Sequence, residues 1–166
     1  MPNTNLPLVL VDFTYTPPDG WSEVQKSQTF DELSVMMCPP GGNWLSRFFL
    51  RFRFYGLLSM LELHVYQYME ERVTDYSRFR DIILHNLSER GATNIESQTG
   101  IRHGETSYEA TFRMFASYSS LVSFVFKGNM FLIIWSSTDK ITFLGYLPKM
   151  ERFIEGLQFR TEKEAS

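Results

Sequence analysis

The sequence lacks several features that would assign it to a particular class of protein. Cys38 is the only cysteine, so the chain cannot form an internal disulfide or a metal site with two cysteine ligands. It contains no stretch of about 18 uncharged apolar residues, so we expect no membrane-spanning helix. The segment from Leu33 to Leu61 has no acidic residue, yet the net charge of the whole chain is −3. A dedicated nucleic-acid-binding domain is usually basic, and this chain is not.

Signals for export are also missing at the start of the sequence. The first five residues carry no positively charged side chain, and the apolar run from Leu8 to Val11 is too short for the core of a signal peptide. We therefore expect a cytoplasmic protein, although an exported protein whose signal had been removed would look the same. The 166 residues are 43% hydrophobic, which suits a single domain over 1–166 with a frayed tail at 161–166.

Alternation of apolar and polar residues predicts strands along much of the chain. Strands are expected within Trp21–Cys38, in two pieces broken near Asp31-Glu32, and at Ser46–Tyr55, Ser59–Met69, Ser107–Ser117, Leu121–Lys127, Met130–Ser136 and Gln158–Arg160. Gly128-Asn129 marks a hairpin between two of these strands. The run from Met130 to Trp135 is apolar on both faces, which is typical of a central strand covered on both sides.

Two helices are predicted. The first spans Asp75 to Arg90, with a cap at Thr74 or Asp75 and Gly91 as its C-terminal stop. Its expected apolar stripe consists of Phe79, Ile82, Ile83 and Leu87. The second lies after Asp139 in a region broken by Gly145 and Pro148, with Pro148 in the first turn of a helix that runs to about Glu155. The order of strands, helix, antiparallel strands and helix predicts an α+β protein with a mainly antiparallel sheet between layers.

The segment Ser46–Tyr55 is rich in arginine and aromatic residues. Period-two alternation places five of them on one strand face: Arg47, Phe49, Arg51, Arg53 and Tyr55. A two-residue turn at Gly56-Leu57 would pair this strand with the next, with Arg51 opposite Glu62 and Arg47 opposite Tyr66. Three interpretations remain open: an internal ladder of charge pairs, a protein-binding or dimer face that includes Tyr66, and a stacking platform for single-stranded nucleic acid.

The sequence offers no catalytic or metal-binding signature. The three histidines, His64, His85 and His103, lack the spacing of metal ligands. There is no G-x-S-x-G elbow and no phosphate-binding loop, although a triad can assemble from residues distant in sequence. We therefore predict no catalytic residue, no metal and no cofactor.

The order of elements resembles that of the PsbP-like superfamily. The likeness rests on the opening segment from Phe13 to Trp21, on the strand and capped helix from Leu61 to Arg90, and on the closing hairpin strands and helix that end at Phe153–Phe159. The segment Pro39–Gly56 departs from the family pattern. The resemblance implies an α/β/α sandwich around a central antiparallel sheet, and the family has no shared catalytic residues to carry over.

The superfamily includes an extrinsic subunit of photosystem II, a Ran-GTPase-binding protein, bacterial lipoproteins and chaperones for type VI secretion effectors. These relatives and the absence of catalytic motifs favour a non-enzymatic accessory, adaptor or chaperone-like protein. We expect it to bind another protein or a second copy of itself, and we do not expect it to bind nucleic acid. The alternative is a small-ligand carrier or an enzyme with a pocket between helix and sheet. A fold resemblance does not choose between them.

Overall fold

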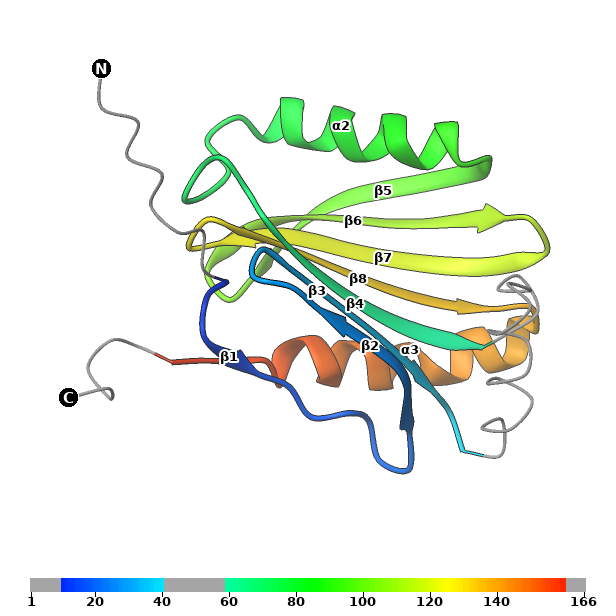
Figure 1. Cartoon of the computed structure of the whole chain (residues 1–166). Coiled ribbons are helices and arrows are strands. Elements are labelled where there is room, and N and C mark those ends of the chain that lie inside the picture. Colours follow the sequence, from blue (N-terminus) through cyan, green and yellow to red (C-terminus); the bar gives the residue numbers. More distant parts are fainter. Residues whose placement is uncertain (1–9, 41–58, 161–166) are drawn as a thin grey trace, which may run out of the picture.

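The computed structural model describes residues 10–40 and 59–160, and residues 1–9, 41–58 and 161–166 lie outside the description. Seven strands form one sheet, two short strands form a second, and two helices pack on the larger sheet (Figure 1). The elements are β1 (Phe13–Thr14), β2 (Ser22–Gln28), β3 (Glu32–Cys38), β4 (Met60–Gln67), α2 (Tyr76–Glu89), β5 (Ala92–Arg102), β6 (Glu105–Met114), β7 (Ser117–Phe126), β8 (Asn129–Ser137), α3 (Lys140–Glu155) and β9 (Gln158–Phe159).

The large sheet is antiparallel throughout, in the order β2-β3-β4-β8-β7-β6-β5. Its central strand is β8, as the apolar run from Met130 to Trp135 predicts. The turn before β8 has positive φ angles at Lys127 and Gly128, 46° and 75°, as a two-residue type I′ turn requires. The hairpin is therefore confirmed, with its turn one residue earlier than Gly128-Asn129.

The two helices lie on opposite faces of the sheet, which confirms the predicted layers (Figure 1). On the α3 face, Phe131, Ile133 and Trp135 of β8 are fully buried with the apolar side chains of β3, β4 and α3. On the α2 face, Met130, Leu132 and Ile134 of β8 are only half-buried. The central strand is thus covered completely on one face and partly on the other.

Trp21 closes one edge of the α3-side core. It is 8% exposed, and its ring centroid lies 5.3 Å from that of Trp135 and 5.3 Å from that of Tyr146. The preceding turn places it there, with the Trp21 N–H donating to the Pro18 carbonyl at 2.9 Å. Aromatic rings at such separations contribute beyond their buried area, so Trp21 anchors the start of β2 to α3.

Both helices differ from the sequence prediction in detail. In α2, Phe79, Ile83 and Leu87 are buried as expected, but Ile82 is 46% exposed because the sheet contacts a narrower side of the helix than the predicted stripe. The second helix is continuous from Lys140 to Glu155, capped by the Asp139 side chain, with Pro148 inside it. The predicted break is wrong, because Pro148 is exposed and packing of Phe143, Met150 and Phe153 holds both halves on the sheet.

The predicted pairing of β4 is also wrong. From Leu61 to Tyr66, β4 pairs with β3 on one edge and with β8 on the other. Both hydrogen-bonding edges are occupied, so Glu62 lies opposite Met36 and Ile134, and not opposite Arg51. Tyr66 lies opposite Glu32 and Met130, and not opposite Arg47. The predicted hairpin is wrong because β3 and β8 already occupy the two edges of β4.

Candidate protein-binding surface

The α2 face of the sheet is only partly covered by α2. The helix packs on Tyr108 and Ala110 of β6 and on Leu121 and Val125 of β7. Leu121 of β7 lies opposite Ile134 of β8. Ile134 in turn lies opposite Glu62 of β4, and Glu62 lies opposite Met36 of β3. Residues directly opposite each other point to the same face of a sheet. This alignment places β8, β4 and β3 side chains beside α2, on a part of the face that the helix does not cover.

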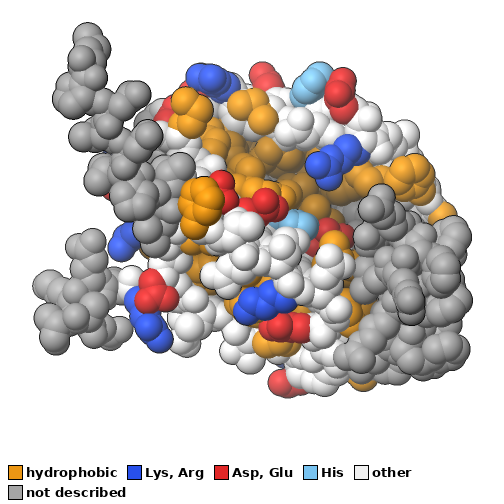
Figure 2. All heavy atoms as spheres, in the orientation of Figure 1, with side chains coloured by type: hydrophobic (Ala, Val, Ile, Leu, Met, Phe, Trp, Pro, Cys, Tyr) orange, Lys and Arg blue, Asp and Glu red, His pale blue; other side chains and the backbone are white. Residues whose placement is uncertain are grey.

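We call this region the α2-side surface and define it by eight residues. They are Ser34, Met36, Glu62, His64, Tyr66, Met130, Leu132 and Ile134, all half-buried. Figure 2 shows hydrophobic side chains gathered on this face below α2, with charged side chains around them. Because half-buried apolar residues are contiguous here, the surface differs from the scattered exposed apolar residues that any soluble protein carries.

A polar strip crosses the α2-side surface along β4. The Nε2 atom of His64 lies 2.8 Å from Glu62 Oε2, and the rings of His64 and Tyr66 stack at a centroid separation of 6.1 Å and an interplanar angle of 6°. These contacts hold the three side chains against the sheet. Burial, together with the nearby Glu32 carboxylate, raises the pKa of the Tyr66 hydroxyl, so it stays protonated.

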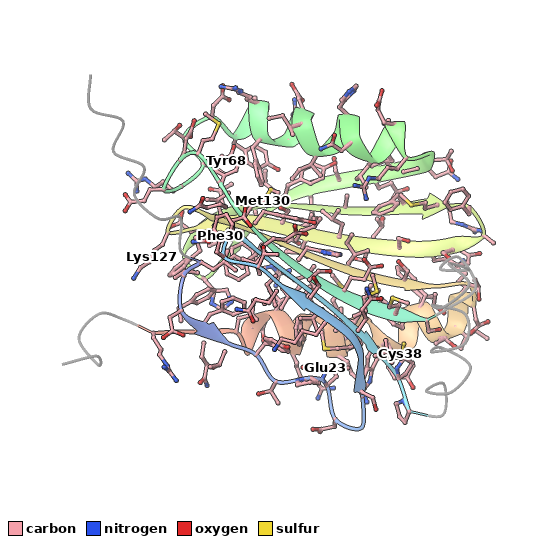
Figure 3. The ribbon with its side chains drawn as sticks, viewed as in Figure 1. Glu23, Phe30, Cys38, Tyr68, Lys127 and Met130 are labelled. Atoms are coloured by element: carbon pink, nitrogen blue, oxygen red, sulfur yellow. The ribbon has the colours of Figure 1, made fainter. Side chains whose placement is uncertain are left out.

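One end of the surface is fixed by a contact between two loops. The Tyr68 N–H donates to the Gly128 carbonyl at 2.8 Å, and the Gly128 N–H donates to the Glu71 carbonyl at 2.7 Å. Figure 3 shows Phe30, Tyr68 and Met130 at this end, near the turn that contains Lys127. Phe30 is 72% exposed. An exposed aromatic residue at the rim extends the apolar area available to a partner.

The sequence-predicted contact patch divides between described and undescribed residues. Arg47, Phe49, Arg51, Arg53 and Tyr55 lie outside the described residues, so the arginine patch stays a prediction. Tyr66 is described, and it lies on the α2-side surface. The sequence analysis missed Met36, Leu132 and Ile134 as its neighbours, because their proximity arises from the β3-β4-β8 strand order.

A hollow lies on the opposite face of the sheet, between α3 and strands β5, β6 and β7. We call it the α3-side groove. Its volume is about 990 Å³, and its lining includes Leu144 and Leu147 of α3, Gln98 of β5, Thr111 of β6 and Ser120 of β7. The groove therefore has a mixed lining, with apolar Val122 on the strand side and charged Glu151 and Arg152 on the α3 side. Its size falls within the range of small-molecule sites.

An ion-pair network beside this groove ties β5, β6 and α3 together. Arg102 Nε donates to Glu109 at 2.7 Å, and its two terminal nitrogens donate to Glu151 at 2.7 and 3.3 Å. Burial alone would raise the pKa of Glu109, but hydrogen bonds from Arg102 and Ser107, with the Arg102 charge, lower it instead. A carboxylate held ionised in this way acts as a structural counter-charge, since a general base has a pKa nearer neutrality.

Each of the three histidines has a different neighbour. His64 contacts Glu62, His85 Nε2 lies 3.8 Å from Glu89, and His103 Nε2 lies 2.7 Å from the Ile154 carbonyl. Among residues 10–40 and 59–160, no three His, Cys, Asp or Glu side chains are grouped so that they could hold a metal ion. Nor does any helix in these ranges have the length and apolar character needed to cross a membrane.

Comparison with known proteins identifies the fold. No protein-family model and no curated protein sequence matches the chain. Among solved structures, the chain is similar to the solution structure of cyanobacterial PsbP (CyanoP) from Synechocystis sp. PCC 6803, with a TM-score of 0.56 and 9% sequence identity. The likeness covers 96% of this chain and 97% of that one. The chain therefore has the PsbP-like fold, an α+β sandwich of two helices on a seven-stranded antiparallel sheet.

Proposed function

We propose that this protein is a non-enzymatic accessory or chaperone-like protein that binds another protein through its α2-side surface. The observation that carries the proposal is the contiguous set of half-buried apolar residues, Met36, Leu132 and Ile134, beside the ordered strip of Glu62 and His64. Protein interfaces combine a desolvated apolar centre with polar groups that fix orientation. This surface has both, held on strands rather than on loops.

The contacts of the polar side chains support a binding role over a catalytic one. In the α2-side surface, the histidine faces a carboxylate and a tyrosine ring, so its orientation is already fixed. In the α3-side groove, Glu109 accepts hydrogen bonds from Arg102, Ser107 and Gln98. Carboxylates and imidazoles paired in this way contribute to the structure, and Glu109, which accepts three hydrogen bonds, is poorly placed to take a proton from a substrate.

A photo-crosslinking experiment tests the surface directly. A benzophenone-bearing amino acid is placed at Tyr66, which is already aromatic, and in a second variant at Thr111 on the floor of the α3-side groove. Both are exposed to an extract of the source cells and irradiated. A discrete protein adduct from position 66, absent from position 111, supports the proposal. Equal labelling at both positions, or none at position 66, contradicts it.

The captured partner then allows a quantitative test. Met36→Lys places an ammonium group in the apolar part of the surface, where the facing Glu62 carboxylate limits its cost to folding. We expect it to weaken binding of the purified partner, whereas Met36→Leu keeps the apolar contact and should bind normally. Leu144→Lys, on the opposite face, is the control for added charge. If Met36→Lys binds as well as Leu144→Lys, the surface is not the binding site.

A second candidate function is carriage of a small apolar ligand in the α3-side groove, and the groove volume of about 990 Å³ favours it. Nile red, an uncharged apolar dye, serves as the probe. Thr111→Trp fills the groove floor, so it should abolish dye binding if the groove is the site. Dye binding that is lost in Met36→Lys instead would assign the apolar site to the α2-side surface.

A further inference from the structure

The outer edge of β5 is a second candidate contact, separate from both faces of the sheet. β5 is the last strand of the large sheet, and among the described elements it pairs only with β6. From Glu96 to Arg102, each residue faces a successive residue of β6, from Thr111 to Glu105, without a break in register. The backbone N–H and C=O groups on the outer side of this seven-residue stretch have no strand partner there. Such an edge is a template for another strand.

The opposite edge of the same sheet, formed by β2, is protected against pairing with another strand. β2 has a register shift between Glu23 and Gln25, in the first half of the strand, and it carries Lys26. Bulges and lysines are the devices by which proteins block edge-to-edge pairing. The stretch of β5 from Glu96 to Arg102 has no register shift, no lysine and no proline. Its bulge lies earlier, between Thr93 and Glu96.

We propose that this edge of β5 joins two copies of the chain, paired antiparallel about a two-fold axis at Thr99. Thr99 is the midpoint of the regular stretch, so an axis there uses all seven residues of both copies. In this register the two residues of each pair are an even number of positions apart in the sequence. Their side chains therefore point to the same face of the joined sheet. The two α2 helices lie on one face of the joined sheet, the two α3 helices lie on the other, and the contact is a closed two-fold interface.

The side chains along this register are complementary. Glu96 lies opposite Arg102 of the second copy, and the same pair recurs across the axis. Arg102 uses three of its five N–H groups on Glu109 and Glu151, which leaves two donors. Glu96 is exposed and has no ion-pair partner in the described part of the chain. Ile101, 76% exposed, lies opposite Ser97, so pairing also covers apolar surface.

Mass measurement in solution tests whether the pair forms. Light scattering on the wild-type chain should give twice the 19.5 kDa mass of one chain. Thr99→Lys should return the mass to that of a monomer, because two lysines would face each other across the axis, while Thr99→Ser should stay dimeric. Thr99 is exposed, so the melting of diluted monomer should not change. A monomeric wild-type chain, or a dimeric Thr99→Lys variant, overturns the proposal.

Cysteine crosslinking tests the register independently of any charge effect. Residues directly opposite in an antiparallel pair have Cα atoms about 5 Å apart, within the reach of a disulfide. Thr99→Cys should therefore crosslink two chains under mild oxidation. In a Ser97→Cys variant, the two cysteines of the paired copies lie four residues apart along the strands, a separation of about 13 Å. This variant should therefore not crosslink. The native Cys38 is buried and gives a low background. No crosslink from Thr99→Cys, or equal crosslinking of Ser97→Cys, refutes this register.

Discussion

Replacing Gly100 with alanine should destabilise the protein, although the same change in a strand usually stabilises it. A Cβ atom at position 100 would lie 2.8 Å from Glu109 Cδ and 2.8 Å from Ser107 Oγ, and closer still to Glu109 Oε1. Cβ atoms do not approach other atoms so closely, so the Glu109 carboxylate would have to move. It is held by Arg102 at 2.7 Å, and Arg102 in turn holds Glu151 of α3.

Two opposing effects set the size of the change in stability. Replacing glycine with alanine raises the free energy of unfolding by about 0.5–1 kcal/mol, because the unfolded chain with alanine has less conformational entropy to lose on folding. A hydrogen bond to a charged group contributes about 1.5–3 kcal/mol, and the displaced carboxylate loses such a bond from Arg102. The lost hydrogen bond outweighs the gain in the unfolded chain, and we expect a net destabilisation of about 1–2 kcal/mol. For a chain of this size the melting temperature should fall by about 3–6 °C.

Thermal and urea unfolding, followed by circular dichroism, measure this effect. The same substitution in a Glu109→Ala background removes the colliding carboxylate, and the remaining Ser107 hydroxyl can rotate away. In that background Gly100→Ala should be neutral or stabilising. A change of sign between the two backgrounds identifies the collision as the cause. If Gly100→Ala raises the melting temperature of the otherwise wild-type chain, the reasoning about the network is wrong.

Three further predictions concern the core and the ion-pair network. Trp21→Ala should cost about 3–5 kcal/mol in urea unfolding, because the side chain is buried against Trp135 and Tyr146, and strong acrylamide quenching of Trp21 would contradict that burial. Ile133→Asp should abolish cooperative melting through an unpaired charge in the central strand, whereas Thr93→Asp, at an exposed position, should melt normally. Because the pKa of Glu109 is lowered in the folded protein, its ionised form adds stability above the ordinary carboxyl pKa, and this stability is lost as the pH falls. Glu109→Gln should therefore reduce the loss of stability between about pH 5 and pH 3. An acid-unfolding profile that this substitution leaves unchanged would count against the ion pair.

Local patterns predicted most of the elements, because each depends on residues close in sequence. The alternation of Tyr108, Ala110 and Phe112 identified β6 and its buried face. The cap expected at Thr74 or Asp75 located the start of α2, where the structure shows Asp75 as the capping residue. The PsbP-like fold followed from the order of such elements. The break expected at Pro148 was wrong because a local rule was outweighed by packing of the flanking turns on the sheet.

Features set by strand order could not be read from the sequence. The α2-side surface depends on Leu132 lying beside His64, and His64 beside Ser34, which are pairs from distant segments. The α3-side groove depends likewise on α3 lying over β8 while the floor comes from β5, β6 and β7. Tyr66 was predicted as a contact residue through a pairing with Arg47. In the structure it lies on the α2-side surface because β4 pairs with β3 and β8.

The strand order also has a consequence for the route of folding. Strands β5 to β8 form a meander in which each pairs with the next in sequence, so they can assemble by short loop closures. The ladder between β4 and β8 brings Leu61 opposite Trp135, and it can close only after a long stretch of chain is ordered. We expect β2, β3 and β4 to join the sheet last. Until they do, the apolar edge of β8 is open to other molecules, so refolding yield should fall steeply as the protein concentration rises.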